Sequence, residues 1–181
     1  MRTIILMSLS LALLYGFTVK QHALTFKYPK NKSAAFTMQA QKAKFKKEWR
    51  GEDYYYFCEN LQNEIVCSVL FYKLNQEEQK KYIEPIGGKG NATIALAYFT
   101  VNSATRKYEK NANFWGKATD PFMFRHMDIP EYEGTVVNQK NMFAYTMFGN
   151  DLFVNVHLSK INCTAEDSIL MRNFLTGLTK K

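Results

Sequence analysis

Cysteine, histidine, tryptophan and proline are all rare in this chain, which has three, three, two and four of them among 181 residues. The scattered histidines and the wide spacing of the cysteines match no zinc-binding pattern. Nine glycines and four prolines are too few for a low-complexity chain, and no sequence repeat is visible. Acidic residues are fewer than basic ones: the chain has 16 Asp and Glu residues and 24 Lys and Arg residues, which gives a formal net charge of +8.

Aromatic and aliphatic side chains are plentiful instead. Hydrophobic residues make up 46% of the chain and charged residues 22%, both near the average of globular proteins, so a folded core is expected. The 14 Phe and 11 Tyr residues favour a strand-rich core, since aromatic side chains suit the half-buried surface of a sheet. The length predicts one domain, either alone or together with a targeting segment.

The N-terminal residues have the pattern of a secretory signal peptide. Arg2 provides a positive charge, and Ile4–Phe17 is an almost unbroken apolar run. The run is shorter than the roughly 20 residues that a membrane-spanning helix needs, although an uncleaved anchor stays an alternative. We expect a signal peptide over residues 1–23 and a single domain over residues 24–181. The mature protein is then periplasmic or secreted and has no membrane span, and export argues against a nucleic-acid partner.

Three lysines alternate with other residues in the segment that follows the first predicted strand. Lys42, Lys44 and Lys46 would share one solvated face if this segment were a strand. The pattern favours a surface or edge strand that its charges protect from aggregation over a patch for an acidic partner.

Two segments rich in aromatic and branched residues, 54–58 and 64–74, predict a β-hairpin. With Gln62–Asn63 as a two-residue loop, Cys58 faces Cys67 where the side chains of antiparallel strands approach most closely. Such a position suits a disulfide, which requires a short distance between the two Cβ atoms.

A four-residue loop over residues 60–63 is the alternative, and it would shift the register and separate the two sulfurs. Export makes an oxidising destination expected, so we predict a Cys58–Cys67 disulfide in the mature protein. Cys163 is left over and is interpreted as a buried thiol, with a bridge to one of the other cysteines or a reactive thiol as the alternatives.

The rest of the chain alternates between helices and strands. Helices are expected over 75–85, within 102–118 and over 163–178; strands over 23–29, 35–49, 92–101, 136–148 and 151–161; an extended loop over 119–135; and a flexible connector over 86–91. Asn75 and Thr164 are suited to cap the first and last helices. The order predicts an α+β fold with a mostly antiparallel sheet, flanking helices, and the C-terminal helix packed on the sheet.

Three features of the chain occur in a fixed order. They are an early strand ending in the letters FKYP, a meander rich in aromatic residues, and a late hairpin. The last strand runs directly into the closing helix, as LFVNVHLSKINCTAEDSILMRNFLTGL. Together these features resemble the PsbP-like α/β/α sandwich family over most of residues 24–179. The resemblance implies a non-enzymatic role, as an assembly factor, accessory protein or partner-binding module. It carries no functional residue over to this chain.

Few residues are candidates for chemistry. Cys163 and His157 are a possible nucleophile and base, but no oxyanion motif accompanies them, so an exported hydrolase is only an alternative and we expect no enzyme. His126 and Asp128, with Glu131 and Glu133, could ligate a cation through oxygen atoms, but they form no EF-hand loop, and we expect no metal and no cofactor.

The loop over 119–135 is the expected recognition surface. It places aromatic rings beside charge, as protein-binding loops do, and the alternative is that the same rings cap the core of the sheet. The predicted partner-binding residues are Phe122, Phe124, His126, Asp128 and Tyr132. The expected partner is a protein of the cell envelope or extracellular space. A carrier with a small-ligand pocket between sheet and helices is a further alternative.

Overall fold

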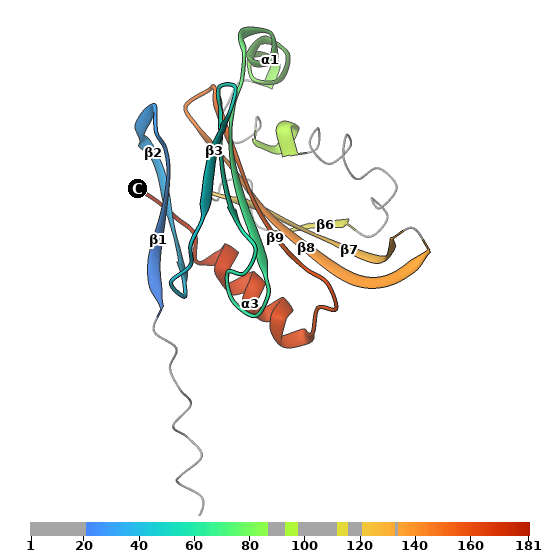
Figure 1. The fold of residues 1–181 in the computed structure, drawn as a ribbon. Helices are drawn as coiled ribbons and strands as arrows, with labels where there is room; N and C mark the ends of the chain where they lie inside the picture. Colours follow the sequence, from blue (N-terminus) through green and yellow to red (C-terminus); the bar gives the residue numbers. More distant parts are fainter. Residues whose placement is uncertain (1–20, 87–92, 98–111, 116–120, 133) are drawn as a thin grey trace, which may run out of the picture.

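The computed structural model of this chain describes residues 21–86, 93–97, 112–115, 121–132 and 134–181 (Figure 1). Several predictions lie outside the described residues. They are the signal peptide up to residue 20, the glycine-rich connector from residue 87 onward, and most of the helix predicted within 102–118.

The described residues form two antiparallel sheets. The small sheet has the strand order β1-β2-β10, and the large one has the order β3-β4-β5-β9-β8-β7-β6. The small sheet consists of β1 (His22–Tyr28), β2 (Asn31–Ala40) and β10 (Thr179–Lys180). The large sheet consists of β3 (Lys46–Arg50), β4 (Asp53–Cys58), β5 (Val66–Lys73), β9 (Leu152–Lys160), β8 (Thr135–Phe148), β7 (Met123–Tyr132) and β6 (Ala112–Trp115). The helical elements are α1 (Gln76–Tyr82), the short 3-10 turn η1 (Glu84–Ile86) and α3 (Ala165–Thr176), and residues 93–97 are also helical.

The main core lies between one face of the large sheet, the small sheet and α3, as Figure 1 shows. Alternate residues of each central strand point into it, because successive side chains of a strand project to opposite faces. On β9 these are Leu152, Val154, Val156 and Leu158, as the sequence predicts, and all four are buried. Met171 and Phe174 of α3 cover them. The α+β class and the position of the C-terminal helix are therefore confirmed.

A second, smaller core forms on the opposite face of the large sheet. Phe143, Tyr145 and Phe153 project from β8 and β9 and belong to one buried cluster with Leu96 and Ala97 of the helical segment 93–97. The sequence predicts a strand there, and the prediction is wrong. Burial explains the difference, because the buried residues 93, 96 and 97 follow the period of a helix and not that of a strand.

Both predicted helix caps are present. The Asn75 side chain accepts a hydrogen bond from the backbone of Glu78 at the start of α1, and Thr164 accepts one from Asp167 at the start of α3. In each case the acidic side chain bonds back to the backbone of the cap, which completes a capping box.

The β7 strand replaces the predicted extended loop over 119–135. Pro130 favoured a loop, since proline cannot donate a ladder hydrogen bond. In the structure it lies at a register shift between Ile129 and Glu131, where a bulge leaves one residue unpaired. At Trp115, β6 likewise replaces a predicted helix, because its residues pair with β7.

The hairpin of β4 and β5 has the predicted register with a different loop. Cys58 and Cys67 are direct Cα partners, as expected. The two-residue turn at Gln62 is not present; strand pairing stops at Cys58, and the chain passes through left-handed backbone at Asn63 and Glu64 (φ 51° and 60°). The loop is therefore longer than the predicted two residues, and Cys58 still lies directly opposite Cys67.

The lysine-rich segment is a strand only from Lys46 onward. Strand β2 ends at Ala40, and Lys42 and Lys44 are exposed in the connection to β3. All of β3 is exposed at the edge of the large sheet, which agrees with the edge-strand interpretation. In the part of the chain that the structure describes, no helix is long and apolar enough to cross a membrane.

Candidate binding surface on strands β6 to β8

Strand β7 carries three of the five predicted partner-binding residues on one face. Phe124 lies opposite Ala144 and His126 opposite Met142, and both of these β8 residues belong to the main core. Phe124, His126 and Asp128 therefore project to the face that α3 covers further along the sheet. Figure 1 shows the β7–β8 hairpin curving beyond that helix, so its end is left uncovered by α3.

The other two predicted residues are placed differently. Phe122 precedes β7 and is 2% exposed, with its ring edge-on to Phe36 in the main core at 5.8 Å. It is therefore a core residue and not part of a binding surface. Tyr132 ends β7 opposite Thr135.

An aromatic cluster forms around Trp115 of β6. Its ring stacks on Phe124 with centroids 5.4 Å apart and lies 5.7 Å from the His126 ring. The guanidinium of Arg172, from α3, lies 5.1 Å from the centre of the Trp115 ring. Trp115, Phe124 and His126 are all half-buried and Arg172 is exposed, so the cluster is fixed by contacts and still reaches solvent.

Charge beside this cluster comes from one ion pair. Lys140 of β8 binds the carboxylate of Asp128 at 3.0 Å, as their direct pairing across the two strands allows. Burial lowers the pKa of His126; Asp128 opposes that shift, whereas Lys140 and Arg172 add to it. His126 is therefore neutral near pH 7. We call Trp115, Phe124, His126, Asp128, Lys140 and Arg172 together the arm surface.

A hollow of about 280 Å³ lies at the outer end of the arm surface. Asp128 and Lys140 belong to both. Its lining residues are Asp128, Ile129, Pro130, Asn138, Gln139, Lys140 and Cys163. The volume is just below the roughly 300–1,000 Å³ of typical small-molecule pockets. It suits one inserted side chain of a partner better than an enclosed ligand.

The Cys163–His157 pair does not form a catalytic site in the structure. Cys163 packs against the main core, whereas His157 stacks on Phe143 at 4.5 Å on the opposite face of the sheet. His157 hydrogen-bonds Asn141 (Nε2 to Oδ1, 2.9 Å), and burial lowers its pKa to about 4. Burial and the nearby Asp167 raise the pKa of Cys163, so its thiol is protonated. The nucleophile and base are thus separated by the sheet itself.

The cysteines of the β4–β5 hairpin are buried and reduced in the structure. Cys58 and Cys67 lie opposite each other in the main core, and both are free thiols. Burial raises the pKa of each thiol. Their opposition is the geometry that a bridge requires, and the disulfide itself stays a prediction.

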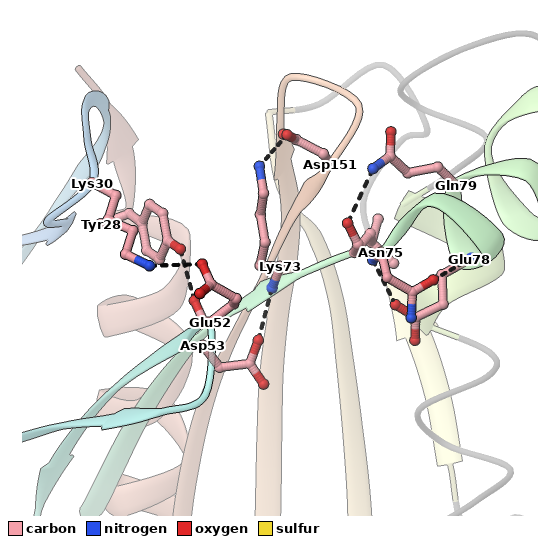
Figure 2. A network of polar contacts seen from close by, with 10 residues as sticks. Tyr28, Lys30, Glu52, Asp53, Lys73, Asn75, Glu78, Gln79 and Asp151 are labelled. Carbon is pink, nitrogen blue, oxygen red and sulfur yellow. Dashed lines mark hydrogen bonds and ion pairs between the residues drawn. The ribbon is translucent and has the colours of Figure 1, made fainter.

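A polar network joins the turns at one end of the sheets (Figure 2). Lys30 binds Glu52 at 2.7 Å, and the Tyr28 hydroxyl donates to the Glu52 carbonyl. The backbone N–H of Lys73 donates to Asp53, and its ammonium group pairs with Asp151. Lys30 and Lys73 each pair with a carboxylate, whereas Asp53 accepts a hydrogen bond from the backbone, and we assign the network to holding the turns together.

Sequence reasoning missed half of the arm surface. Trp115 was assigned to a helix, and Lys140 and Arg172 gave no signal of their own. The aromatic pair Phe114–Trp115 in an otherwise polar segment could have indicated a strand. Arg172 follows exposed Ile169 by three residues, so both lie on one face of α3 that does not enter the core.

The fold and surface define a small α+β domain with a half-buried aromatic cluster beside charged side chains. No protein-family profile and no curated protein sequence matches the chain. Among solved structures, it is similar to the solution structure of cyanobacterial PsbP (CyanoP) from Synechocystis sp. PCC 6803. The TM-score is 0.49 with 12% identity, and the match covers 92% of this chain and 96% of that one. This neighbour bears the name of the family that the sequence resembles, and no functional residue comes with it.

Proposed function

We propose that this chain is an exported, non-catalytic accessory protein that binds a protein partner of the cell envelope or extracellular space through the arm surface. The observation that supports this most directly is the half-buried cluster of Trp115, Phe124 and His126 with Arg172 over the tryptophan ring. Tryptophan and arginine are the residue types that most often dominate the binding energy of protein interfaces.

Exposed apolar side chains extend the same region. Ile169 of α3 is 61% exposed, Ile161 between β9 and α3 is 58% exposed, and Val136 near the start of β8 is 71% exposed. Backbone hydrogen bonds from Asn162 to the Val137 carbonyl and from Cys163 to the Asn138 carbonyl bring the last two segments together. An apolar patch rimmed by charge is typical of an interaction site.

The non-catalytic part of the proposal rests on the separation of Cys163 from His157. The described residues also contain no group of three or more His, Cys, Asp or Glu side chains that could hold a metal ion. Export rests on the signal-peptide pattern of residues 1–23.

Crosslinking in the producing cell tests this proposal. A photo-crosslinking amino acid in place of Phe124 should capture one protein, and the same amino acid in place of Trp49 should not. Trp49 is a suitable control because it is 44% exposed but lies on edge strand β3, away from the arm surface. Purified wild-type protein should recover the same partner from envelope extract.

Variants separate binding from folding. Trp115→Ala and Arg172→Ala should each reduce recovery of the partner about tenfold or more, while Trp49→Ala leaves it unchanged. All three proteins should keep the wild-type circular dichroism spectrum. Equal crosslinking at both positions contradicts the proposal, and so does enzymatic turnover that Cys163→Ser abolishes. Intact mass of the exported protein tests cleavage within residues 1–23.

A small-ligand carrier is the second candidate, and one observation favours it. Arg125 is 1% exposed on the face opposite the arm surface, with its guanidinium near the rings of Phe114 and Phe143 at 5.6 and 5.7 Å. Its Nε–H has no hydrogen-bond acceptor among the described residues. A buried cation is stabilised by an anion, so the ligand would have an acidic head group. Native mass spectrometry of gently purified protein should then show a bound small molecule that Arg125→Leu loses.

A further inference from the structure

The outer face of β3 and β4 forms a second hollow, on the other side of the sheet from α3. Tyr54, Tyr56 and Cys58 of β4 face the main core, so Tyr55 and Phe57 project outward. Pairing across the strands sets Lys46 opposite Phe57 and Glu48 opposite Tyr55. The hollow has a volume of about 210 Å³, and its lining residues are Lys46, Glu48, Arg50, Tyr55 and Phe57.

Two aromatic rings form the floor of this hollow. The centroids of Tyr55 and Phe57 are 6.2 Å apart and their planes are only 13° from parallel, so the rings present similar orientations. Both are half-buried, and the Arg50 guanidinium lies 4.0 Å from the centre of the Tyr55 ring. Such a floor suits a flat ligand with polarised C–H groups, which aromatic faces attract through their negative quadrupole.

The charges around the hollow are balanced. Arg50 pairs with Glu48 beside it, and Lys46 pairs with Glu59 at 3.1 Å. A polyanion would therefore find no excess of positive charge among these four side chains. Adjacent guanidinium and carboxylate groups offer donors and acceptors together, which matches a hydroxyl group because a hydroxyl both donates and accepts.

The size of the hollow limits the ligand further. About 210 Å³ is less than the roughly 300–1,000 Å³ of pockets that enclose a drug-sized molecule. It accommodates one ring-sized unit. Because the hollow lies on an exposed edge of the sheet, further units of a chain can continue past it into solvent.

We propose that this face binds a neutral oligosaccharide. The C–H face of one pyranose ring packs on Tyr55 and Phe57, where it displaces the exposed Arg50 guanidinium from the Tyr55 ring, and its hydroxyls exchange hydrogen bonds with Glu48 and Arg50. The proposal does not depend on the protein partner, since the arm surface lies on the opposite face of the large sheet. Protein and glycan could be bound at the same time.

Titration of the full chain with soluble sugars tests the proposal. The ligands are cellohexaose and chitohexaose as neutral pyranose chains, polygalacturonate as an acidic glycan, and polyglutamate as an acidic polymer without sugar. Backbone amide shifts in a ¹H–¹⁵N spectrum are followed at each addition. A neutral oligosaccharide should shift amides of residues 46–57 in a saturable way, and polyglutamate should not.

Alternation along the strand provides matched controls. Tyr55→Ala should weaken binding about tenfold, the equivalent of one aromatic stacking contact. Trp49→Ala and Lys47→Gln should leave affinity unchanged. Both residues lie on β3 next to Glu48, but their side chains project to the opposite face of the sheet. Glu48→Gln together with Arg50→Gln should also weaken binding, which separates hydrogen bonding from stacking.

Three results would overturn the proposal. The first is that neither neutral oligosaccharide shifts the amides of residues 46–57. The second is that polyglutamate shifts them as strongly as the sugars do. The third is that Trp49→Ala weakens binding as much as Tyr55→Ala does. None of these affects the protein partner, which is tested by crosslinking at Phe124. Unchanged circular dichroism spectra and thermal midpoints show that each variant is folded.

Discussion

Reduction of the predicted Cys58–Cys67 bridge is expected to lower the free energy of unfolding of the exported protein. The bridge closes a loop of about ten residues, from one cysteine through the turn to the other. Closing such a loop in the unfolded chain corresponds to about 2–3 kcal/mol in the chain-entropy model. For a domain of this size, that corresponds to a fall in the melting temperature of roughly 5–10 °C.

The geometry of the β4–β5 hairpin indicates that a Cys58–Cys67 bridge would introduce little strain. Cys58 and Cys67 are already direct Cα partners in antiparallel strands, and both side chains point into the main core. Forming the bond therefore requires no change of register. The bridged form should keep the wild-type fold, and the partner and glycan surfaces should be unaffected, since neither contains a cysteine of this pair.

Thermal melts with and without reductant provide the assay, together with alkylation mapping of the exported protein. The double variant Cys58→Ala/Cys67→Ala should melt at one temperature whether or not reductant is present, and Cys163→Ala should keep the wild-type difference. Three alkylated thiols in the exported protein, or a bridge that involves Cys163, would refute the reasoning. A reductant-sensitive midpoint in the double variant would refute it as well.

Three further predictions concern stability. Burial lowers the pKa of His157 from 6.5 to about 4, so the contribution of the neutral ring to the free energy of unfolding is complete above about pH 6.5. As the pH falls toward 4, up to about 3 kcal/mol of that contribution is lost. Urea midpoints of the wild type and of His157→Gln, compared at pH 7.5 and 4.5, measure this loss. Asp167→Ala should cost about 1–2 kcal/mol in urea unfolding, because it removes the acidic half of the α3 capping box and the ion pair with Lys160 at 3.5 Å. Asp53→Ala should cost about 1 kcal/mol, because the N–H of Lys73 loses its acceptor, whereas the exposed Glu52→Gln should leave the urea midpoint unchanged.

The sequence predicted correctly those elements whose caps and apolar spacing lie within one continuous segment. The α3 helix carries its cap at Thr164 and its apolar residues at helical spacing, so its position follows from adjacent sequence. Alternation along β4 predicts that Tyr54, Tyr56 and Cys58 share the core face, whereas the register with β5 was predicted from a two-residue loop that the structure does not contain. The loop between these strands was not predictable in the same way, because Asn63 and Glu64 adopt left-handed backbone that their residue types do not demand.

Elements that depend on distant partners were predicted less well. Strand β6 forms because β7 pairs with it, and β7 tolerates Pro130 because the bulge falls at that position. The same limit applies to the arm surface. Phe124, His126 and Asp128 could be predicted as a set from one segment, whereas Arg172 joins Trp115 from 57 residues away along the chain. Only the packing of α3 beside the sheet brings them together.

The strand order of the large sheet has a consequence for how the protein folds. Strands β3, β4 and β5 are sequential neighbours, and so are β6, β7, β8 and β9, so each group can form as a meander of local hairpins. The two meanders meet only where β5 pairs with β9, along residues such as Val69 and Val156. Closing that long-range pair has the largest loop-entropy cost in the sheet, and long-range pairing slows folding.

Substitutions at this β5–β9 seam should therefore have a different kinetic signature from substitutions inside either meander. Val69→Ala and Ala144→Gly both remove apolar contacts from the main core, but only the first lies on the seam. Their effects on the folding rate report whether the seam is already formed at the barrier. The glycan-binding face belongs to one meander and most of the arm surface to the other, so each surface is built largely from contacts that can form before the two halves of the sheet join.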